Sequence, residues 1–134
     1  MLTSQLLLDT HIVFRWFAQP NKLSREQLRA IQAAEARQGP VGVSAYSLIE
    51  FVLLAEAQKL PRSALKEILE QCETNPLLQL LPFTAEIAAE MAAMGDYLRD
   101  PGDRVIVATA RVHGMRLITA DQRIIESHLV PVIE

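Results

Sequence analysis

The segment Leu6-Leu7-Leu8-Asp9-Thr10 is a run of three leucines that ends at an acid and a hydroxyl residue. A short, continuously apolar run of this kind predicts a buried strand. Further short strands are predicted at residues 41–43, 77–81 and 116–119, and helical apolar spacing occupies the segments between them. Strands that alternate with helices predict an α/β domain, in which a parallel sheet is covered on both faces.

Capping residues and prolines set the expected limits of the elements. Ser24, with Gln27 three residues later, has the spacing of a capping box, and Ser44 and Ser63 are each expected to cap a helix. Residues 130–133 predict a last strand at an edge of the sheet, because Pro131 has no backbone N–H to donate. Helices are predicted after the first strand, ending before Pro20, and over residues 25–38, 45–58, 64–73, 85–94 and 103–113.

Length and composition predict one domain over residues 1–134. Half of the 134 residues are hydrophobic and 22% are charged, which supports a real core. Thirteen Lys and Arg against sixteen Asp and Glu give a net charge of −3, which excludes a general polybasic coat for nucleic acid. The charge-free runs are shorter than the ~20 residues of a membrane helix, and no basic residue precedes Arg15. Cys72 is the single cysteine, so no internal disulfide can form. We expect a cytoplasmic protein with no membrane partner.

Three acidic residues are expected to meet at one edge of the sheet. Asp9 follows the first strand, Asp121 follows the fourth, and Glu50 lies in the second turn of the helix after the second strand. Open parallel sheets bind ligands at the carboxyl ends of their strands. Asp103 falls near the start of its own helix, whose place relative to the sheet the sequence leaves open.

Most of these acids also have a structural interpretation. Asp9 could cap the first helix, and Asp121 could belong to a turn or cap a short helix after it. Asp100-Pro101 has the pattern of a helix cap followed by proline at the first helical position, which would place Asp103 at the positive end of the helix.

Glu50 is harder to explain structurally, because it is the only charged residue within the apolar stretch 45–55. An isolated carboxylate in a helix that is apolar on nearly every side is costly unless it is compensated. Close carboxylates also raise one another's pKa, and a hard divalent cation such as Mg²⁺ or Mn²⁺ relieves both problems. Zinc is disfavoured, because Cys72 is alone and the histidines lack zinc-ligand spacing. Such a cluster suits phosphodiester hydrolysis by a metal-activated water.

Four segments together resemble the PIN domain, and more narrowly the VapC-like toxins of toxin–antitoxin pairs. The resemblance implies a three-layer α/β/α PIN-like domain with a central, mostly parallel sheet and Mg²⁺- or Mn²⁺-dependent endoribonuclease activity. It assigns the catalytic, metal-binding acids to Asp9, Glu50, Asp103 and Asp121. The segments are Leu7-Leu8-Asp9-Thr10-His11, Val43-Ser44-Ala45-Tyr46-Ser47-Leu48-Ile49-Glu50, Asp100-Pro101-Gly102-Asp103-Arg104-Val105-Ile106-Val107-Ala108-Thr109-Ala110 and Leu117-Ile118-Thr119-Ala120-Asp121.

The resemblance also implies supporting roles around these acids. Thr10 and Thr119 would steady the acids or a metal-bound water, and Asp100 would either support the site or cap its helix. Arg104 would hold an acid or reach a phosphate. Gly102 departs from the family pattern, which often has a bulky apolar residue there, and would loosen the loop.

The expected partners are an RNA substrate, a second copy in a homodimer, and a cognate antitoxin that covers the acidic groove. Phe14, Trp16, Phe17 and the stretch 51–55 either supply a partner surface or belong to the core. The arginines of the C-terminal third either form a basic rim around the acids or a solvated face; they are Arg99, Arg104, Arg111, Arg116 and Arg123.

Two other functions compete with the nuclease. The alternative is a non-catalytic PIN-like module that binds RNA or protein in the same groove. An Asp-based phosphatase or phosphoryl receiver is disfavoured, because His11 stands where a phosphatase has a second aspartate and no lysine follows Lys66.

Overall fold

The structure, a computed structural model, describes residues 5–134, so the first four residues of the predicted domain lie outside the described residues. The described chain contains a five-stranded sheet in the order β3-β2-β1-β4-β5, with every neighbouring pair parallel. As predicted, β5 is an edge strand and starts just after Pro131. The strands are β1 (Leu6–Leu8), β2 (Val41–Ser44), β3 (Leu78–Leu81), β4 (Arg116–Ile118) and β5 (Val132–Ile133).

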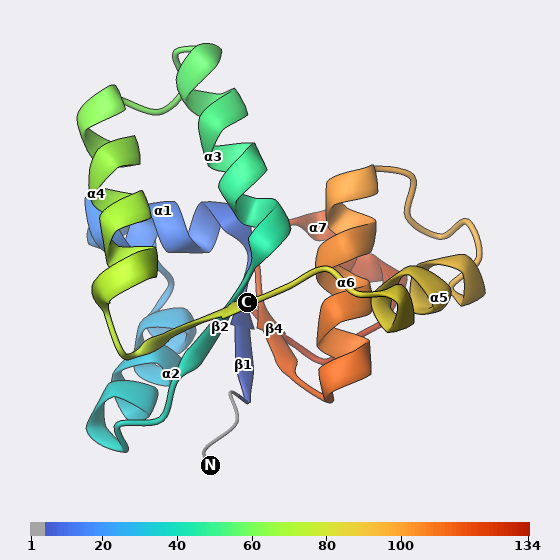
Figure 1. Cartoon of the computed structure of the whole chain (residues 1–134). Coiled ribbons are helices and arrows are strands. Elements are labelled where there is room, and N and C mark those ends of the chain that lie inside the picture. Colours follow the sequence, from blue (N-terminus) through green and yellow to red (C-terminus); the bar gives the residue numbers. More distant parts are fainter. Residues whose placement is uncertain (1–4) are drawn as a thin grey trace.

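Helices cover both faces of the sheet, which confirms the predicted three-layer α/β/α fold (Figure 1). Leu6 and Leu8 of β1 pack into one hydrophobic cluster, and Leu7 between them packs into the other. The first cluster is covered by α1 (Thr10–Ala18), α2 (Arg25–Ala36), α3 (Ala45–Glu56) and α4 (Arg62–Thr74). The second is covered by α5 (Ala85–Ala93), α6 (Pro101–His113) and α7 (Gln122–Ser127); a short 3₁₀ turn, Pro20–Lys22, follows α1.

Most predicted caps are confirmed, and two predicted helix starts are wrong. The Ser24 capping box with Gln27 is present, and Ser44 accepts a hydrogen bond from the N–H of Tyr46. Ser63 does not cap α4, which begins at Arg62 with Pro61 in the cap position, because the fixed φ of proline suits that position without a side-chain bond. The helix predicted over residues 103–113 begins earlier, at Pro101, and Asp100 caps it, which confirms the capping alternative indicated by the Asp100-Pro101 pattern.

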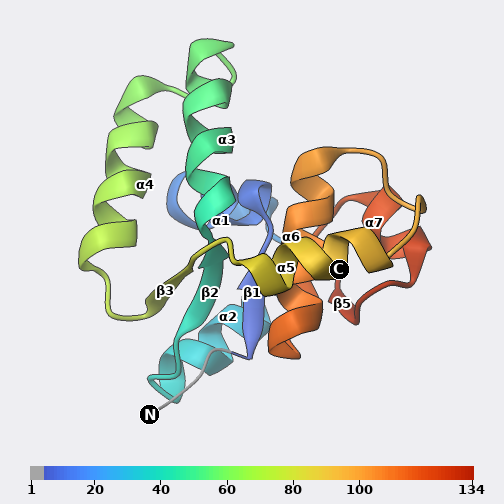
Figure 2. The same cartoon turned by 45° about the vertical axis from the view of Figure 1, so that its right-hand side comes forward.

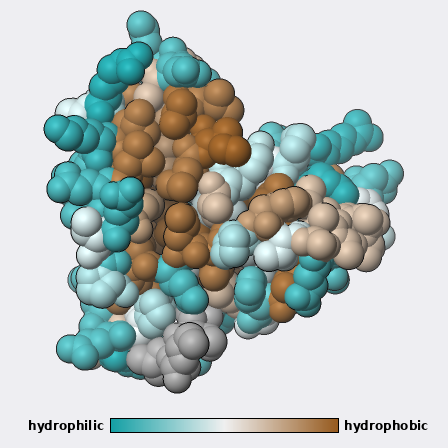
Figure 3. All heavy atoms as spheres, in the orientation of Figure 1, coloured by the Kyte–Doolittle hydropathy of each residue, from teal (hydrophilic) through white to brown (hydrophobic). Residues whose placement is uncertain are grey.

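The α3 helix and its neighbour α4 extend beyond the carboxyl edge of the sheet (Figures 1 and 2). Ile49, Val52 and Leu53 recur on one side of α3 and are 53%, 40% and 54% exposed; we call them the α3 apolar face. A hydrophobic surface covers this part of the molecule in Figure 3. Among the described residues, no helix is both long and apolar enough to cross a membrane.

The structure decides whether the aromatic residues of α1 form a partner surface or belong to the core. Phe14, Trp16 and Phe17 are half-buried and pack against the first cluster, so they belong mainly to the core. Of the stretch 51–55, Phe51 and Ala55 are buried. The exposed apolar surface therefore lies on α3 rather than on α1.

Candidate active site

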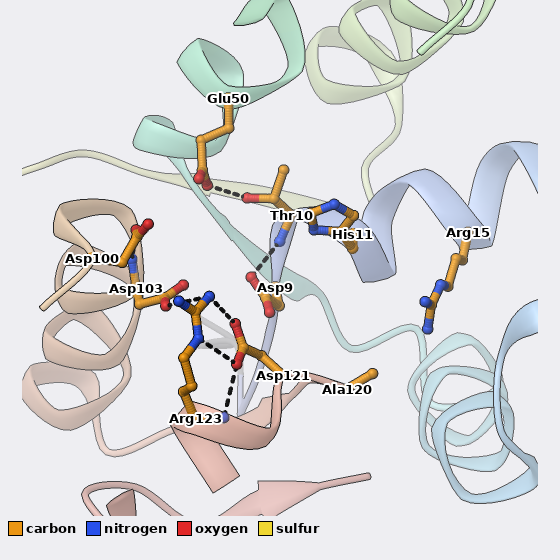
Figure 4. A pocket seen from close by; sticks show the side chains of 10 residues that line it. All are labelled: Asp9, Thr10, His11, Arg15, Glu50, Asp100, Asp103, Ala120, Asp121 and Arg123. Atoms are coloured by element: carbon orange, nitrogen blue, oxygen red, sulfur yellow. Dashed lines mark hydrogen bonds and ion pairs between the residues drawn. The ribbon is translucent and has the colours of Figure 1, made fainter. Parts of the chain in front are cut away.

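A pocket of about 290 Å³ opens at the carboxyl edge of the sheet and gathers residues from four separate parts of the chain (Figure 4). All four predicted acids line it, together with Asp100. Asp103, whose place the sequence left open, reaches the pocket because the N-terminal end of α6 lies beside α3. The lining residues are Asp9, Thr10, His11, Arg15, Glu50, Asp100, Asp103, Ala120, Asp121 and Arg123.

Asp9 is both a helix cap and a pocket residue. Its Oδ1 accepts a hydrogen bond of 2.8 Å from the N–H of Thr10 at the start of α1, and its Oδ2 accepts one of 2.7 Å from the Thr119 hydroxyl. The Thr119 oxygen in turn accepts the N–H of Asp121 at 3.0 Å. The residues that follow β1 and β4 are thus tied together, and the Asp9 carboxylate is fixed in orientation with lone pairs still available.

Glu50 is held by a short chain of hydroxyl groups. The Thr10 hydroxyl donates to Glu50 Oε1 at 2.5 Å, and the Ser47 hydroxyl lies 2.8 Å from the Thr10 oxygen. The single hydroxyl proton of Thr10 is used in the hydrogen bond to Glu50. In the second bond the Ser47 hydroxyl therefore donates and the Thr10 oxygen accepts. Sequence analysis missed Ser47, although its position three residues before Glu50 places both on one side of α3.

Gly102 allows the first turn of α6 to lie against Glu50. A Cβ atom at this position would be 2.7 Å from Glu50 Oε2, 3.0 Å from Tyr46 Cε1 and 3.2 Å from Asp100 Oδ1. The prediction that Gly102 loosens a loop is wrong, because the residue is buried inside α6. The Glu50 carboxylate occupies the space that a side chain at position 102 would fill.

Asp100, Asp103 and Asp121 complete the far side of the pocket. Asp100 caps α6 by accepting the N–H of Asp103 at 3.1 Å, and Asp121 caps α7 by accepting the N–H of Arg123 at 2.9 Å. The Arg123 guanidinium lies between two of these acids, 3.2 Å from Asp121 Oδ2 and 3.6 Å from Asp103 Oδ2. Sequence analysis placed Arg123 among general rim residues and missed this bridge.

Crowding and burial hold several of these acids away from their ordinary ionisation. Burial, together with the nearby charges of Asp121, Asp100 and Asp9, raises the pKa of Asp103 to about 7. Burial also raises the pKa of Asp9 and of Glu50, against the hydrogen bonds from Thr119 and Thr10. Burial would raise the pKa of Asp121 as well, but its bonds with Arg123 outweigh burial and lower it. A divalent cation that bound these carboxylates would relieve their burial and mutual repulsion.

The remaining arginines do not form a basic rim. Arg104 donates to the carbonyls of Met91, Gly95 and Leu98, so both roles predicted for it, holding an acid or reaching a phosphate, are wrong. It instead fixes the end of α5 and the following loop to α6. Arg111 binds Glu90 and the Leu129 carbonyl outside the pocket. Of the five arginines in the C-terminal third, Arg123 alone lines the pocket.

The donor set fits a hard divalent cation with few direct protein ligands. In residues 5–134, no three His, Cys, Asp or Glu side chains are arranged around one point as ligands of a single ion. Mg²⁺ usually binds one or two carboxylates directly and keeps several waters, and it prefers oxygen ligands such as these. The pocket offers carboxylate oxygens on facing sides and room for water between them.

Comparisons with known proteins agree with this architecture. The PIN-domain family model matches residues 6–127. Ribonuclease VapC22 of Mycobacterium tuberculosis is 34% identical over 132 residues, which cover 94% of this chain and 93% of that protein. VapBC2 from Rickettsia felis, solved bound to a promoter DNA fragment, matches with a TM-score of 0.71 at 12% identity, over 95% of this chain and 96% of the other. FitAcB from Neisseria gonorrhoeae matches with a TM-score of 0.69 at 23% identity, over 96% of both chains. The two solved structures share the fold of this chain.

Proposed function

The chain belongs to the PIN-domain family, and on that basis we propose that it is a metal-dependent endoribonuclease, the toxin of a toxin–antitoxin pair. The observation that carries this proposal is the gathering of Asp9, Glu50, Asp103 and Asp121 in one pocket from four distant segments. A relative named as a ribonuclease, with 34% identity over nearly the whole chain, supports RNA as the substrate. An RNA substrate also supports our expectation of a cytoplasmic protein.

We assign the same four acids to holding Mg²⁺ or Mn²⁺, one or two of them directly and the others through its bound waters. When bound, such an ion supplies a water of lowered pKa and positive charge beside the scissile phosphate. The chain's own part is to orient the oxygens. Thr119 and the N–H of Thr10 fix the Asp9 carboxylate, and the Ser47–Thr10 chain fixes Glu50. These bonds remove the rotational freedom that a ligand carboxylate would otherwise lose on binding.

The direct test is incubation of the purified protein with total RNA in millimolar Mg²⁺ or Mn²⁺, followed by mapping of the new RNA ends. We expect cleavage at a restricted set of sites with either ion and none after chelation. Binding of RNA without new ends in either metal would contradict the nuclease and favour the non-catalytic binding module. Cleavage that persists in excess chelator would contradict only the metal requirement.

A change at Gly102 tests whether the position of Glu50 matters. In Gly102→Ala, the new Cβ would displace the Glu50 carboxylate, which is the flexible end of its side chain, so the fold should survive. We expect about a tenfold loss of cleavage, in the range found for disturbed outer-sphere contacts at metal sites, with little change in melting temperature. The measurement is the cleavage rate beside a thermal melt.

A compensating variant sharpens this test. Shortening the acid in Gly102→Ala/Glu50→Asp relieves the contact, so part of the lost activity should return. Gly39→Ala is the matched control, because nothing lies within 4 Å of a Cβ there. Equal cleavage by Gly102→Ala and the parent would show that Glu50 needs no such space.

The α3 apolar face supports a protein partner in this system. Glu50 lies on the same helix beside Ile49, and Leu53 lines a groove together with Glu50 and His11. The apolar face is therefore continuous with the acidic pocket. A solved toxin–antitoxin complex from Klebsiella pneumoniae has a similar fold, with a TM-score of 0.66 at 20% identity, so we assign the surface to the antitoxin and retain the homodimer as a further partner. Light scattering on the protein alone tests the homodimer, because one copy has a mass of 15.0 kDa and a dimer has twice that mass.

A further inference from the structure

Arg123 occupies an unusual place for a basic residue, because it neutralises the acids that the proposed function assigns to a metal. Its Nε and Nη2 lie 3.4 and 3.2 Å from the two oxygens of Asp121, and Nη2 also lies 3.6 Å from Asp103. The Asp103 and Asp121 side chains are only 13% and 23% exposed, whereas that of Arg123 is 71% exposed. The guanidinium lies between the two carboxylates (Figure 4) and belongs to the most exposed of the three side chains.

No other cation does this within the part of the chain that the structure describes. Arg15 also lines the pocket, but the ion pairs to pocket carboxylates in residues 5–134 all come from Arg123. Two positive charges cannot share the same oxygens without strong repulsion. A divalent cation that binds Asp103 and Asp121 must therefore push the guanidinium away, and an exposed side chain on a short helix can move at little cost.

We propose that Arg123 exchanges partners: it pairs with Asp103 and Asp121 in the metal-free protein and, once a divalent cation takes those carboxylates, binds a phosphate of the RNA at the pocket mouth. The proposal rests on the metal-dependent nuclease proposed above. After the guanidinium moves, the residue itself stays at the pocket mouth, because the backbone N–H of Arg123 still donates to Asp121 Oδ1. Its planar fork matches two phosphate oxygens as well as it matches a carboxylate.

The experiment compares the parent with Arg123→Gln by Mg²⁺ titration in a calorimeter and by RNA cleavage at saturating Mg²⁺. Without its competitor, the metal should bind Arg123→Gln about three- to tenfold more tightly, the range expected for loss of a partly exposed ion pair. The KM for RNA should rise by a similar factor while kcat changes little. Arg116→Gln is the matched control: it makes the same change in net charge, from −3 to −4, at the exposed first residue of β4.

An NMR measurement on the unmutated protein reads the exchange directly, even if the variant folds poorly. The Nε–H signal of Arg123 should move toward that of a solvent-exposed arginine when Mg²⁺ saturates the site. If the parent binds Mg²⁺ and cleaves RNA, but this signal stays fixed and Arg123→Gln binds Mg²⁺ no more tightly, the exchange is wrong and the nuclease stands. An unchanged KM would overturn the phosphate contact. If the parent neither binds Mg²⁺ nor cleaves RNA, the proposed function fails as well.

Discussion

Replacing Asp9 by Asn is expected to lower RNA cleavage at least about 100-fold while leaving the fold intact. Disturbing outer-sphere partners of a metal typically costs about 10- to 100-fold, and this substitution removes a charged oxygen assigned to the metal itself. The fold should persist, because the oxygen of the new amide can still cap the N–H of Thr10. A neutral amide also avoids the cost of burying a negative charge, the effect that raises the pKa of Asp9. The measurement is the initial cleavage rate in Mg²⁺, beside a thermal melt of each protein.

The matched control is Asp96→Asn, which makes the same change in net charge at an exposed position outside the pocket. It should cleave RNA as the parent does. If the Asp9→Asn protein keeps the parent's rate and melts at the parent's temperature, the assignment of Asp9 to the reaction is wrong. A parallel loss of rate and melting temperature would instead assign Asp9 mainly to capping α1.

The second large effect is a dependence of stability on pH that comes from Asp103. Well below the unfolded-state pKa of 3.8, the carboxyl is protonated in both the folded and the unfolded chain, so Asp103→Asn should change the stability little there. As pH rises, the unfolded chain releases this proton first, because burial raises the pKa in the folded protein from 3.8 to about 7. The folded parent therefore loses stability as pH rises through this range, and the Asn variant does not.

At pH 8 without metal, Asp103→Asn should be the more stable protein, by on the order of 2 kcal/mol after allowance for solvent screening, or about 7 °C in melting temperature. A divalent cation should reverse this order. At a Mg²⁺ concentration of about 100 times Kd, the parent gains about 2.7 kcal/mol, whereas the variant has lost an assigned ligand.

Thermal melts at pH 4, 6 and 8, with chelator and then with Mg²⁺, measure both effects. Asp96→Asn again serves as the control and should follow the parent at every pH. Equal melting temperatures of parent and Asp103→Asn at pH 8 in chelator would contradict the raised pKa of Asp103. A preserved difference in saturating Mg²⁺ would contradict its role as a ligand.

For two of the acids, the structural and the functional interpretation are both correct. Asp9 and Asp121 were expected either to cap helices or to line a site, and each caps its helix while also lining the pocket. The two roles are compatible because the first turn after a parallel strand begins at the carboxyl edge of the sheet, where ligands bind. The cap supplies the orientation that a ligand carboxylate needs.

The sequence by itself determined the order of strands and helices, most of the caps and the expectation that Asp9, Glu50 and Asp121 meet at one edge. These features are readable because apolar periodicity and caps act over a few neighbouring residues. Only the tertiary structure decided which groups touch across the pocket. The Thr10–Glu50 and Thr119–Asp9 bonds join residues 40 and 110 positions apart. The packing of α6 on α3, which Gly102 permits, likewise has no local signal. Such contacts depend on how whole elements pack, so no short stretch of sequence encodes them.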